Sequence, residues 1–503
     1  MIIFLTIAAS LSPLLTFAHL FQLKEWRWDR LHEHIRSEGI RSIFGVSRPM
    51  LIGVVLVGLL VTGYWLLVPV ILLLITALNI LQIALRKQPY PVWTQKTISL
   101  VGTGLIFTGS TSYWLLVTGY WFPIVLLPLL QPAFLLAAWT TWKPIDLTLK
   151  HRILQKAQAL RAQFPNITVI GITGSAGKTT TKELLAHILG PDRALATPEH
   201  VNTELGVAQW LIKNLQPTTY NLQPVLIVEM GAYREGEITT LCDITKPTIG
   251  IITSIGTQHI GLFGSQKAIA EAKGELFAAL PQNGHAFMNN DTPFAQELRK
   301  KCACPVTTVS TGTHADILAT HIEETAEGLR FHVRNTPCTV PIHGEHQLGS
   351  VLLAIATATE LGIALENIVQ KLKNFRPLKH TFSLREEHGI QILDDTHNAS
   401  PESFRAAIAW ARHQPHKPKI LVTTGIIEQG LSSARTHFQC GTLAKDVFDE
   451  ACVLNKKFAQ FFAEGFGRTV PYNLQPTTYN LPPGSLLVCV GRVPQNIIHK
   501  FLP

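Results

Sequence analysis

One short loop contains the residues best suited to bind phosphate. Gly171 to Thr180 has the sequence Gly-Ile-Thr-Gly-Ser-Ala-Gly-Lys-Thr-Thr, in which Ile172 stands where the common Gly-x4-Gly-Lys-Ser/Thr loop has its first glycine. Glycines let backbone N–H groups close around phosphate oxygens, and the start of a following helix favours anions. The Lys178 ammonium can neutralise β- and γ-phosphates, and the Thr179 hydroxyl can bind Mg²⁺. We therefore predict an ATP-binding loop comprising Gly174, Ser175, Ala176, Gly177, Lys178, Thr179 and Thr180.

Two further metal ligands are predicted after the next apolar segments. Glu229 ends the run 225–229, where a carboxylate can hold Mg²⁺ beside the phosphates, and His259 follows the run 248–253 as a candidate ligand of a second Mg²⁺. Taken alone, Glu229 is equally compatible with a structural carboxylate, and His259 with an ordinary loop histidine. The nearby phosphate loop favours the metal-binding interpretation.

The elements that would position these residues alternate between strand and helix. Short β-branched runs at 167–172, 225–229, 248–253 and 285–288 are separated by helical stretches such as 179–189 and 267–280. This alternation predicts a parallel sheet covered by helices. We expect an α/β fold with a P-loop parallel-sheet ATPase domain over residues 146–374, including a small β-rich insertion near 306–342. A Rossmann-like α/β domain is expected over 375–503, and a helical transmembrane region over 1–145.

Several further segments follow the loop in a fixed order. They are Asn202-Thr-Glu-Leu-Gly206, Val228-Glu-Met-Gly-Ala232, Thr253-Ser-Ile-Gly-Thr-Gln-His259, Ala272-Lys-Gly-Glu275, Asn289-Asn-Asp291, Gly344-Glu-His346 and Asp395-Thr-His-Asn-Ala-Ser-Pro-Glu-Ser403. With Gly-x-x-Gly-Lys-Thr-Thr, this series resembles the Mur ligase family. The last segment is most similar to the members that add D-alanyl-D-alanine to a UDP-muramoyl tripeptide.

The resemblance implies an ATP- and Mg²⁺-dependent peptide ligase of peptidoglycan precursor synthesis. Such an enzyme phosphorylates a substrate carboxylate, and an amine then attacks the acyl phosphate to form an amide. The implied catalytic residues are Lys178, His259 and Lys273, and the implied metal ligands are Thr179, Glu229 and His259. Asn289, Asp291 and Asp395 would contact the nucleotide, whereas Asn202, His397 and Asn398 would line the substrate site.

Lys273 has two opposed interpretations. It lies between Glu271 and Glu275 on an expected helix, so the residues alone favour a solvated charged surface. In the family that it resembles, this lysine can be carbamylated by CO₂ and so become an anion that supports the second metal.

The chain departs from the family pattern at three places. The linker reads Phe375-Arg-Pro-Leu-Lys-His-Thr381, without the family's usual arginine after its phenylalanine–proline turn. The γ-phosphate contact of that arginine is then either lost or taken by Arg376, Lys379 or Arg385. Gln347 and Ser350 stand in place of asparagines, and Cys489-Val-Gly-Arg492 replaces a Lys-Gly-Ser-Arg pattern. These departures affect mainly the contribution of the C-terminal domain and the identity of the acceptor.

The first 150 residues have the composition of a membrane region. The runs 50–85 and 97–139 contain no charged residue, and we expect about five spans, at 2–21, 50–65, 66–85, 97–117 and 120–140. Basic residues fall after the first, third and fifth spans, so the positive-inside bias places the segment after Trp142 in the cytoplasm. We expect a multi-pass protein of the inner (cytoplasmic) membrane that acts as a monomer.

Charge and cysteine content support this assignment. The net charge is +9, but residues 1–150 hold eleven Lys and Arg against five Asp and Glu, so no nucleic-acid partner is implied. The seven cysteines include no Cys-x-x-Cys pair, which suits a reducing cytoplasm.

Three functions remain open. The first is the addition of a D-amino-acid dipeptide to a UDP-linked muramoyl peptide. The family's soluble members begin with a domain that binds the UDP end, and the spans occupy that stretch here. A Mur-type enzyme that modifies a lipid-linked precursor is therefore the second. An ATP-binding membrane scaffold without ligase activity is the third.

Overall fold

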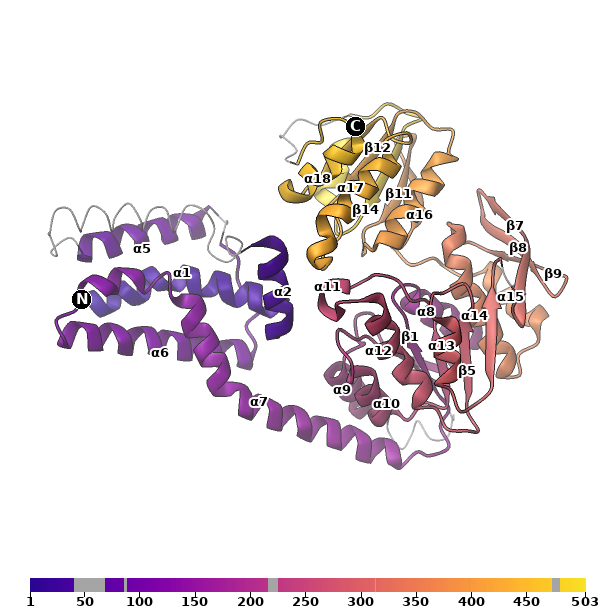
Figure 1. Cartoon of the computed structure of the whole chain (residues 1–503), viewed down its shortest axis with the longest axis horizontal. Coiled ribbons are helices and arrows are strands. Elements are labelled where there is room, and N and C mark those ends of the chain that lie inside the picture. The colour runs from indigo at the N-terminus through magenta and orange to yellow at the C-terminus, as the bar shows by residue number, and fades with distance from the viewer. Residues whose placement is uncertain (40–67, 86–87, 216–224, 313, 398, 473–479) are drawn as a thin grey trace. The chain divides into compact units, whose positions relative to one another are not determined.

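A computed structural model describes residues 1–39, 68–85, 88–215, 225–312, 314–397, 399–472 and 480–503. The chain forms two compact units, Met1–His151 and Arg152–Pro503 (Figure 1). The second unit contains two sheets, each with its own helices and hydrophobic core.

The first unit is helical. Its elements are α1 (Ile2–Leu23), α2 (Trp28–Glu38), α5 (Val68–Ala84), α6 (Gln95–Val117), the 3-10 helix η2 (Phe122–Leu126) and the first part of α7 (Gln131–Ala162). Helix α1 packs against α5 and α6. Among the described residues, α1 and α6 are long and apolar enough to cross a membrane, and α5 is a shorter apolar helix.

Two of the five expected membrane spans do not match a single described helix. The span at 50–65 lies outside the described residues. The expectation of one helix at 120–140 is wrong, because the structure has η2 there and then begins α7 at Gln131. Pro123 and Pro128 lack the N–H group that a continuing helix needs, which is why the chain forms short turns before α7.

The central sheet has the strand order β2-β3-β1-β4-β5-β6-β7-β8-β9. Strands β2 to β6 pair in parallel with their neighbours, whereas β7, β8 and β9 form an antiparallel edge. Its strands are β1 (Val169–Thr173), β2 (Ala194–Ala196), β3 (Val225–Glu229), β4 (Ile249–Ile252), β5 (His285–Asn289), β6 (Val306–Ser310), β7 (Ile317–Thr325), β8 (Gly328–Val333) and β9 (Thr336–Val340). The β-rich stretch near 306–342 therefore continues the main sheet.

Helices cover both faces of this sheet. They are α8 (Lys178–Leu189), α9 (Glu204–Asn214), α10 (Glu237–Thr245), α11 (Ile260–Phe263), α12 (Gln266–Ala278), α13 (Ala295–Lys300), the 3-10 helix η4 (Glu345–Gln347), α14 (Leu348–Glu360) and α15 (Leu365–Lys373). Helices α8, α14 and α15 share one core with β6 to β9, whereas α9, α10 and α12 share the other with the end of α7. The ends of parallel strands meet at one edge, and the loops after β1, β3 and β4 therefore converge.

The second sheet has the order β10-β11-β14-β12-β13, with β10 as an antiparallel edge. Its elements are β10 (Ser383–Glu387), β11 (Ile390–Asp395), α16 (Pro401–Arg412), β12 (Lys419–Thr423), η5 (Gly430–Ser432), α17 (Ser433–Ala444), β13 (Glu450–Val453), α18 (Lys456–Phe466), β14 (Leu486–Val490), α19 (Gln495–Ile498) and η6 (His499–Phe501). The prediction of two α/β sheets after a helical region is confirmed.

Candidate active site

The predicted phosphate loop joins β1 to α8. Gly174 and Gly177 have positive φ values of 154° and 82°, and a Cβ atom would clash with the Thr253 hydroxyl at the first position and with the Ser350 hydroxyl at the second. Backbone N–H groups of Ser175 and Ala176 donate to the carbonyl and hydroxyl oxygens of Ser254, at 2.8 and 3.0 Å. The loop after β4 therefore holds the phosphate loop against the start of α8.

Two lysines, of which Lys273 is buried and Lys178 half-buried, converge on this loop. The ammonium groups of Lys178 and Lys273 both donate to the Gly174 carbonyl oxygen, at 2.8 and 2.9 Å. The Lys273 side chain is buried within α12, so the expectation of a solvated charged surface is wrong. Burial and the charge of Lys178 lower the pKa of Lys273 well below its ordinary value. Burial also lowers the pKa of Lys178, with Glu229 acting in the opposite direction.

Glu229, at the end of β3, forms the anionic side of the site. Its two carboxylate oxygens accept hydrogen bonds from the Thr179 hydroxyl at 2.9 Å and from the Asn202 amide at 3.0 Å. The buried Lys182 ammonium lies 3.7 Å from the same carboxylate. Burial raises the pKa of Glu229, but Lys178, Asn202, Lys182 and Thr179 outweigh that effect and hold it below its ordinary value. Asn202, expected to line the substrate site, thus positions Glu229.

The hydroxyl oxygen of Thr179 and the carboxylate oxygens of Glu229 are suitable ligands for Mg²⁺. A hydroxyl and an ionised carboxylate stand side by side at the start of α8, and Mg²⁺ prefers oxygen ligands. The residues present therefore fit a bound Mg²⁺–nucleotide, with Thr179 and Glu229 holding the metal and Lys178 facing the phosphates.

His259 follows β4 and contacts the C-terminal domain. Its Nδ1 atom pairs with the Glu428 carboxylate, and its ring packs edge-on against Tyr233 with centroids 4.8 Å apart. Burial lowers the pKa of His259 below its ordinary value; Glu428 raises it, and the charges of Lys178 and Lys273 lower it further. The structure thus brings His259 within the electrostatic reach of both lysines.

Asn289 and Asp291 end β5 and stabilise a turn. The Asn289 side-chain oxygen accepts the Asp291 N–H at 2.9 Å. The Asp291 carboxylate accepts hydrogen bonds from the Ser310 hydroxyl at 2.5 Å and from the Thr311 N–H at 2.9 Å. Both residues thus have structural partners, Asn289 in the turn itself and Asp291 also at the end of β6, and their contact with adenine stays a prediction.

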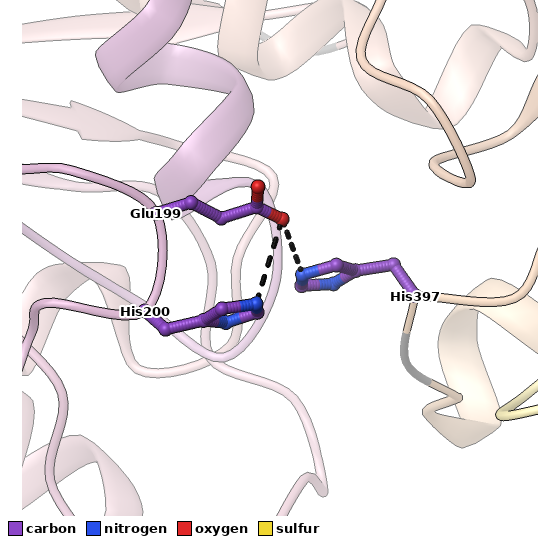
Figure 2. Close-up of side chains that lie close together, drawn as sticks. All are labelled: Glu199, His200 and His397. Carbon is purple, nitrogen blue, oxygen red and sulfur yellow. Dashed lines mark ion pairs between the residues drawn. The ribbon is translucent and has the colours of Figure 1, made fainter.

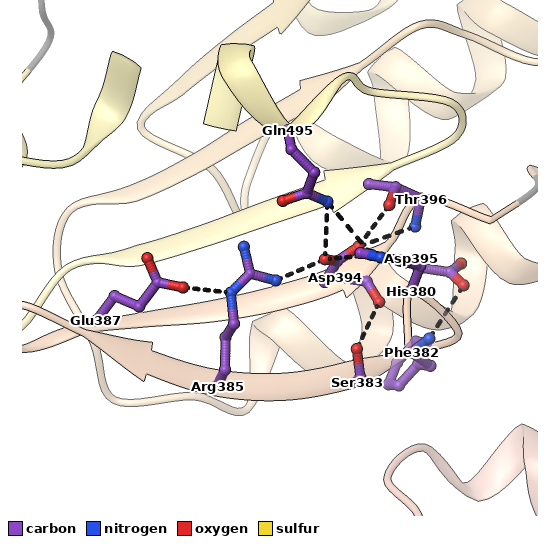
Figure 3. Close-up of polar contacts among 9 residues, drawn as sticks. All are labelled: His380, Phe382, Ser383, Arg385, Glu387, Asp394, Asp395, Thr396 and Gln495. Atoms are coloured by element: carbon purple, nitrogen blue, oxygen red, sulfur yellow. Dashed lines mark hydrogen bonds and ion pairs between the residues drawn. The ribbon is translucent and has the colours of Figure 1, made fainter. Parts of the chain in front are cut away.

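Asp395 ends β11 beside a second acidic residue (Figure 3). One Asp395 oxygen accepts the Phe382 N–H at 3.2 Å, and the other has no hydrogen-bond partner among the described residues. Burial, together with the charge of Asp394, raises the pKa of Asp395 to about 7, although the Phe382 N–H acts against this rise. Its predicted contact with the nucleotide stays a prediction.

The neighbouring Asp394 is surrounded by donors. Its carboxylate lies 2.5 Å from an Arg385 nitrogen and 2.9 Å from His380 Nδ1, and it accepts the Thr396 hydroxyl at 2.6 Å (Figure 3). Arg385 also pairs with Glu387 at 2.7 Å. Arg385 is therefore engaged within the C-terminal domain, and of the three candidates for the linker cation only Arg376 and Lys379 have exposed side chains.

Lys379 lines a cavity of about 560 Å³. Its walls come from the linker, from the start of α8 at Thr180, and from β10 and β11, including Arg385 and Asp394. The cavity thus connects the phosphate-loop helix with the C-terminal domain, which makes Lys379 the better placed cation of the two.

His397 follows β11, and its side chain lies beside Glu199 and His200 (Figure 2). Asn398, predicted to contact substrate, lies outside the described residues.

Five residues of the site and its surroundings were not predicted from the sequence. Lys182, Glu402 and Glu428 surround the site, and the Glu199–His200 pair meets His397. Lys182 follows Lys178 by four residues on α8, which is a signal that could have been used. Glu402 and Glu428 lie 145 and 169 residues from their partners, so only the fold reveals them.

The chain is similar to a known protein family and to its members. The model of the Mur ligase middle domain matches residues 172–358. The UDP-N-acetylmuramoyl-tripeptide--D-alanyl-D-alanine ligase of Bacillus subtilis (strain 168) is 32% identical over 318 residues, which cover 62% of this chain and 68% of that protein. The chain belongs to the Mur ligase family.

A second relative and a solved structure are also similar to this chain. The Mycobacterium tuberculosis (strain ATCC 25618 / H37Rv) protein of the same name is 34% identical over 303 residues, covering 57% of this chain and 58% of that protein. The chain thus spans little more than half the length of that relative. The crystal structure of MurF from Acinetobacter baumannii superposes with a TM-score of 0.62 at 28% identity, over 68% of this chain and 78% of that one.

Proposed function

We propose that this Mur ligase is an ATP-dependent peptide ligase that adds D-alanyl-D-alanine to a UDP-muramoyl tripeptide. The observation that carries the proposal is the convergence of Lys178, Thr179, Glu229 and Lys273 at one phosphate loop. That site supports the class of reaction, an ATP-dependent ligation. The substrates are proposed from the names of two relatives that are 32% and 34% identical to this chain.

The chain's own residues neutralise charge and hold groups in position. Mg²⁺–ATP, when bound, supplies the phosphoryl group that activates the acceptor carboxylate as an acyl phosphate. Lys178 offsets negative charge on the phosphates, and Thr179 and Glu229 hold the metal. Asn202 orients Glu229 through its 3.0 Å hydrogen bond, and the charges of Lys178 and Lys182 favour the ionised form of that carboxylate.

Lys273 is suited to carbamylation. A carbamate forms when a neutral amine attacks CO₂ and releases a proton, and the lowered pKa of Lys273 raises the neutral fraction of that amine. The product would be an anion beside Lys178 and would support His259 as a ligand of a second metal. A carbamate would also remove the repulsion between two ammonium groups that share one carbonyl oxygen.

The deciding experiment measures phosphate release from ATP. UDP-muramoyl tripeptide and D-alanyl-D-alanine are offered separately and together to the full chain in detergent. Release that requires both substrates, with an amide product found by mass spectrometry, supports the proposal. ATP binding without release under any of these conditions supports the scaffold interpretation instead.

A lipid-linked acceptor is the second candidate. The apolar helices α1 and α6 favour it, because they can hold the catalytic unit at a membrane surface where such a precursor resides. In both cases we place the chain in the cytoplasmic membrane, as a multi-pass monomer with its catalytic unit on the cytoplasmic side. Release with a lipid-linked muramoyl peptide, and not with the UDP-linked one, selects this second candidate.

A further inference from the structure

A group of metal-binding side chains lies outside the phosphate-loop site. The Nε2 atoms of His200 and His397 point at one carboxylate oxygen of Glu199, from 3.7 and 3.3 Å (Figure 2). All three ligand atoms lie within 4.8 Å of one another.

Separate parts of the fold supply these side chains. Glu199 and His200 follow β2 of the central sheet, and His397 follows β11 of the C-terminal sheet. The His397 N–H donates to the His380 carbonyl oxygen at 2.8 Å, which fixes its loop. The group therefore joins two domains within the second unit.

The spacing suits a small four-coordinate cation. Zinc binds imidazole nitrogen and carboxylate oxygen at about 2.0–2.2 Å, so neighbouring ligand atoms of a tetrahedral site are about 3.3–3.6 Å apart. The two separations from Glu199, 3.3 and 3.7 Å, already lie near this range. Two imidazoles and a carboxylate leave a fourth position for water or a substrate atom.

A simple ion pair explains the arrangement less well. The imidazole rings of His200 and His397 are stacked almost parallel, 4° apart in orientation and 5.4 Å between centroids. Two imidazolium rings stacked in this way would repel each other, whereas two neutral rings can both bind one cation. The Nε2 atom of His397 is buried and makes no hydrogen bond to any described residue, so no hydrogen bond competes with a metal ion for this atom.

We propose that Glu199, His200 and His397 bind a divalent transition-metal ion of the zinc class, which clamps the C-terminal domain to the central domain. Nitrogen-rich ligand sets select such ions over Mg²⁺, which prefers oxygen. The ion differs in position and chemistry from the Mg²⁺ of the phosphate loop. Its binding does not depend on the proposed ligase function and is measured without ATP.

The first experiment measures Zn²⁺ binding by the metal-free full chain in detergent, in competition with a chromophoric chelator. Wild type should bind one Zn²⁺ at least about tenfold more tightly than H200A, E199Q or H397A, because each removes one of three ligands. The H413A variant is the matched control, since His413 is an exposed histidine that lies on the C-terminal domain outside this group.

The geometry is tested with Co²⁺. Four-coordinate Co²⁺ absorbs visible light far more strongly than six-coordinate Co²⁺, so wild type should show strong bands that H200A lacks. Equal affinities in wild type and all three ligand variants, or only weak six-coordinate bands, would overturn the site.

The clamp is tested by trypsin cleavage after the exposed Lys379 of the linker. Zn²⁺ should slow this cleavage severalfold in wild type and in H413A but not in H200A or E199Q. If Zn²⁺ binds to the three residues without slowing cleavage, the ion does not join the domains and the clamp is rejected.

Discussion

In the proposed mechanism Lys178 neutralises the phosphates from the start of α8, and its removal should stop catalysis. We expect Lys178→Ala to reduce ATP turnover below about a tenth of the wild-type rate, because the neighbouring Lys273 is engaged on the same carbonyl oxygen. Lys178→Arg should also be poor, since a planar guanidinium does not replace a compact ammonium. Phosphate release is the measurement, with the exposed Lys267→Ala as control. Turnover above a tenth would contradict the phosphate-loop assignment.

Lys273 is the residue whose chemical form matters most. If it is carbamylated, Lys273→Ala should abolish ligation, and acetate or formate should partly restore it by filling the vacated anionic position. Thermal unfolding shows whether the variant keeps its fold, and Lys267→Ala on the same helix is the matched control. Near-normal turnover would reject the carbamate, whereas inactivity without rescue would keep Lys273 in the site in another form.

Asp395 should make the stability of the C-terminal domain depend on pH. Its pKa is about 7 in the folded chain against an ordinary value of 3.8, so between these values the folded state binds more protons and stability falls as pH rises. Asp395→Asn removes this effect and should raise the free energy of unfolding at about pH 8 by a few kcal/mol, at about 1.4 kcal/mol per pKa unit.

The measurement is urea unfolding without nucleotide at several pH values, with the exposed Asp192→Asn as control. The variant and wild type should converge below about pH 3, where both folded and unfolded carboxyl groups are largely protonated. A constant difference at all pH values would show that Asp395 is ionised in the folded chain.

Helices α17 and α18 depend on two glycines at their crossing. A Cβ atom on Gly441 would clash with the Phe462 carbonyl oxygen, and one on Gly465 with the Phe438 carbonyl oxygen. Alanine favours an isolated helix by about 1 kcal/mol, yet we expect Gly441→Ala to lower the stability of the C-terminal domain by about 1–3 kcal/mol. Thermal unfolding measures this, and Glu464→Ala, on the exposed face of α18, should change little. Stabilisation by Gly441→Ala would show that the helices do not cross so closely.

The sequence predicts those elements whose residues repeat a simple pattern. Continuous β-branched runs locate β1, β3 and β4 within two residues of their observed ends. Strand β10 escaped prediction because Ser-Leu-Arg-Glu-Glu is a polar edge strand, and β13 because Glu-Ala-Cys-Val contains only one β-branched residue.

Within the site, the phosphate loop is a local pattern and was predictable. The Glu402–Thr257 and Glu428–His259 contacts were not, since each depends on how two domains pack. The burial of Lys273 was likewise set by tertiary packing, against the polar character of its neighbours.

Helix α7 links the two units, and its last turns belong to the second. Ala157 is buried in the central core, and the Arg161 guanidinium donates to the carbonyl oxygens of Thr245 at 2.8 Å and Ile167 at 3.1 Å. A truncated chain beginning at Asp146 retains these contacts. We expect it to remain soluble without detergent and to bind Mg²⁺–ATP, as measured by gel filtration and calorimetry. Aggregation, or loss of nucleotide binding, would place the boundary elsewhere.

Orientation in the membrane is tested on the intact chain. The segment 27–41 should be protected from an impermeant label in whole cells, because its basic residues favour the cytoplasmic side. Labelling of that segment from outside would reverse the proposed topology.

The Glu402 carboxylate accepts hydrogen bonds from the Thr257 N–H and hydroxyl, at 3.1 and 2.9 Å. Thr257 follows Ser254, which holds the phosphate loop through Ser175 and Ala176. Binding equilibria are reciprocal. If binding of the incoming amine strengthens the Glu402–Thr257 contact and so raises the affinity for ATP, then bound ATP raises the affinity for the amine by the same factor. In the proposed reaction, ATP and the amine are therefore expected to bind cooperatively, although neither needs to touch the other.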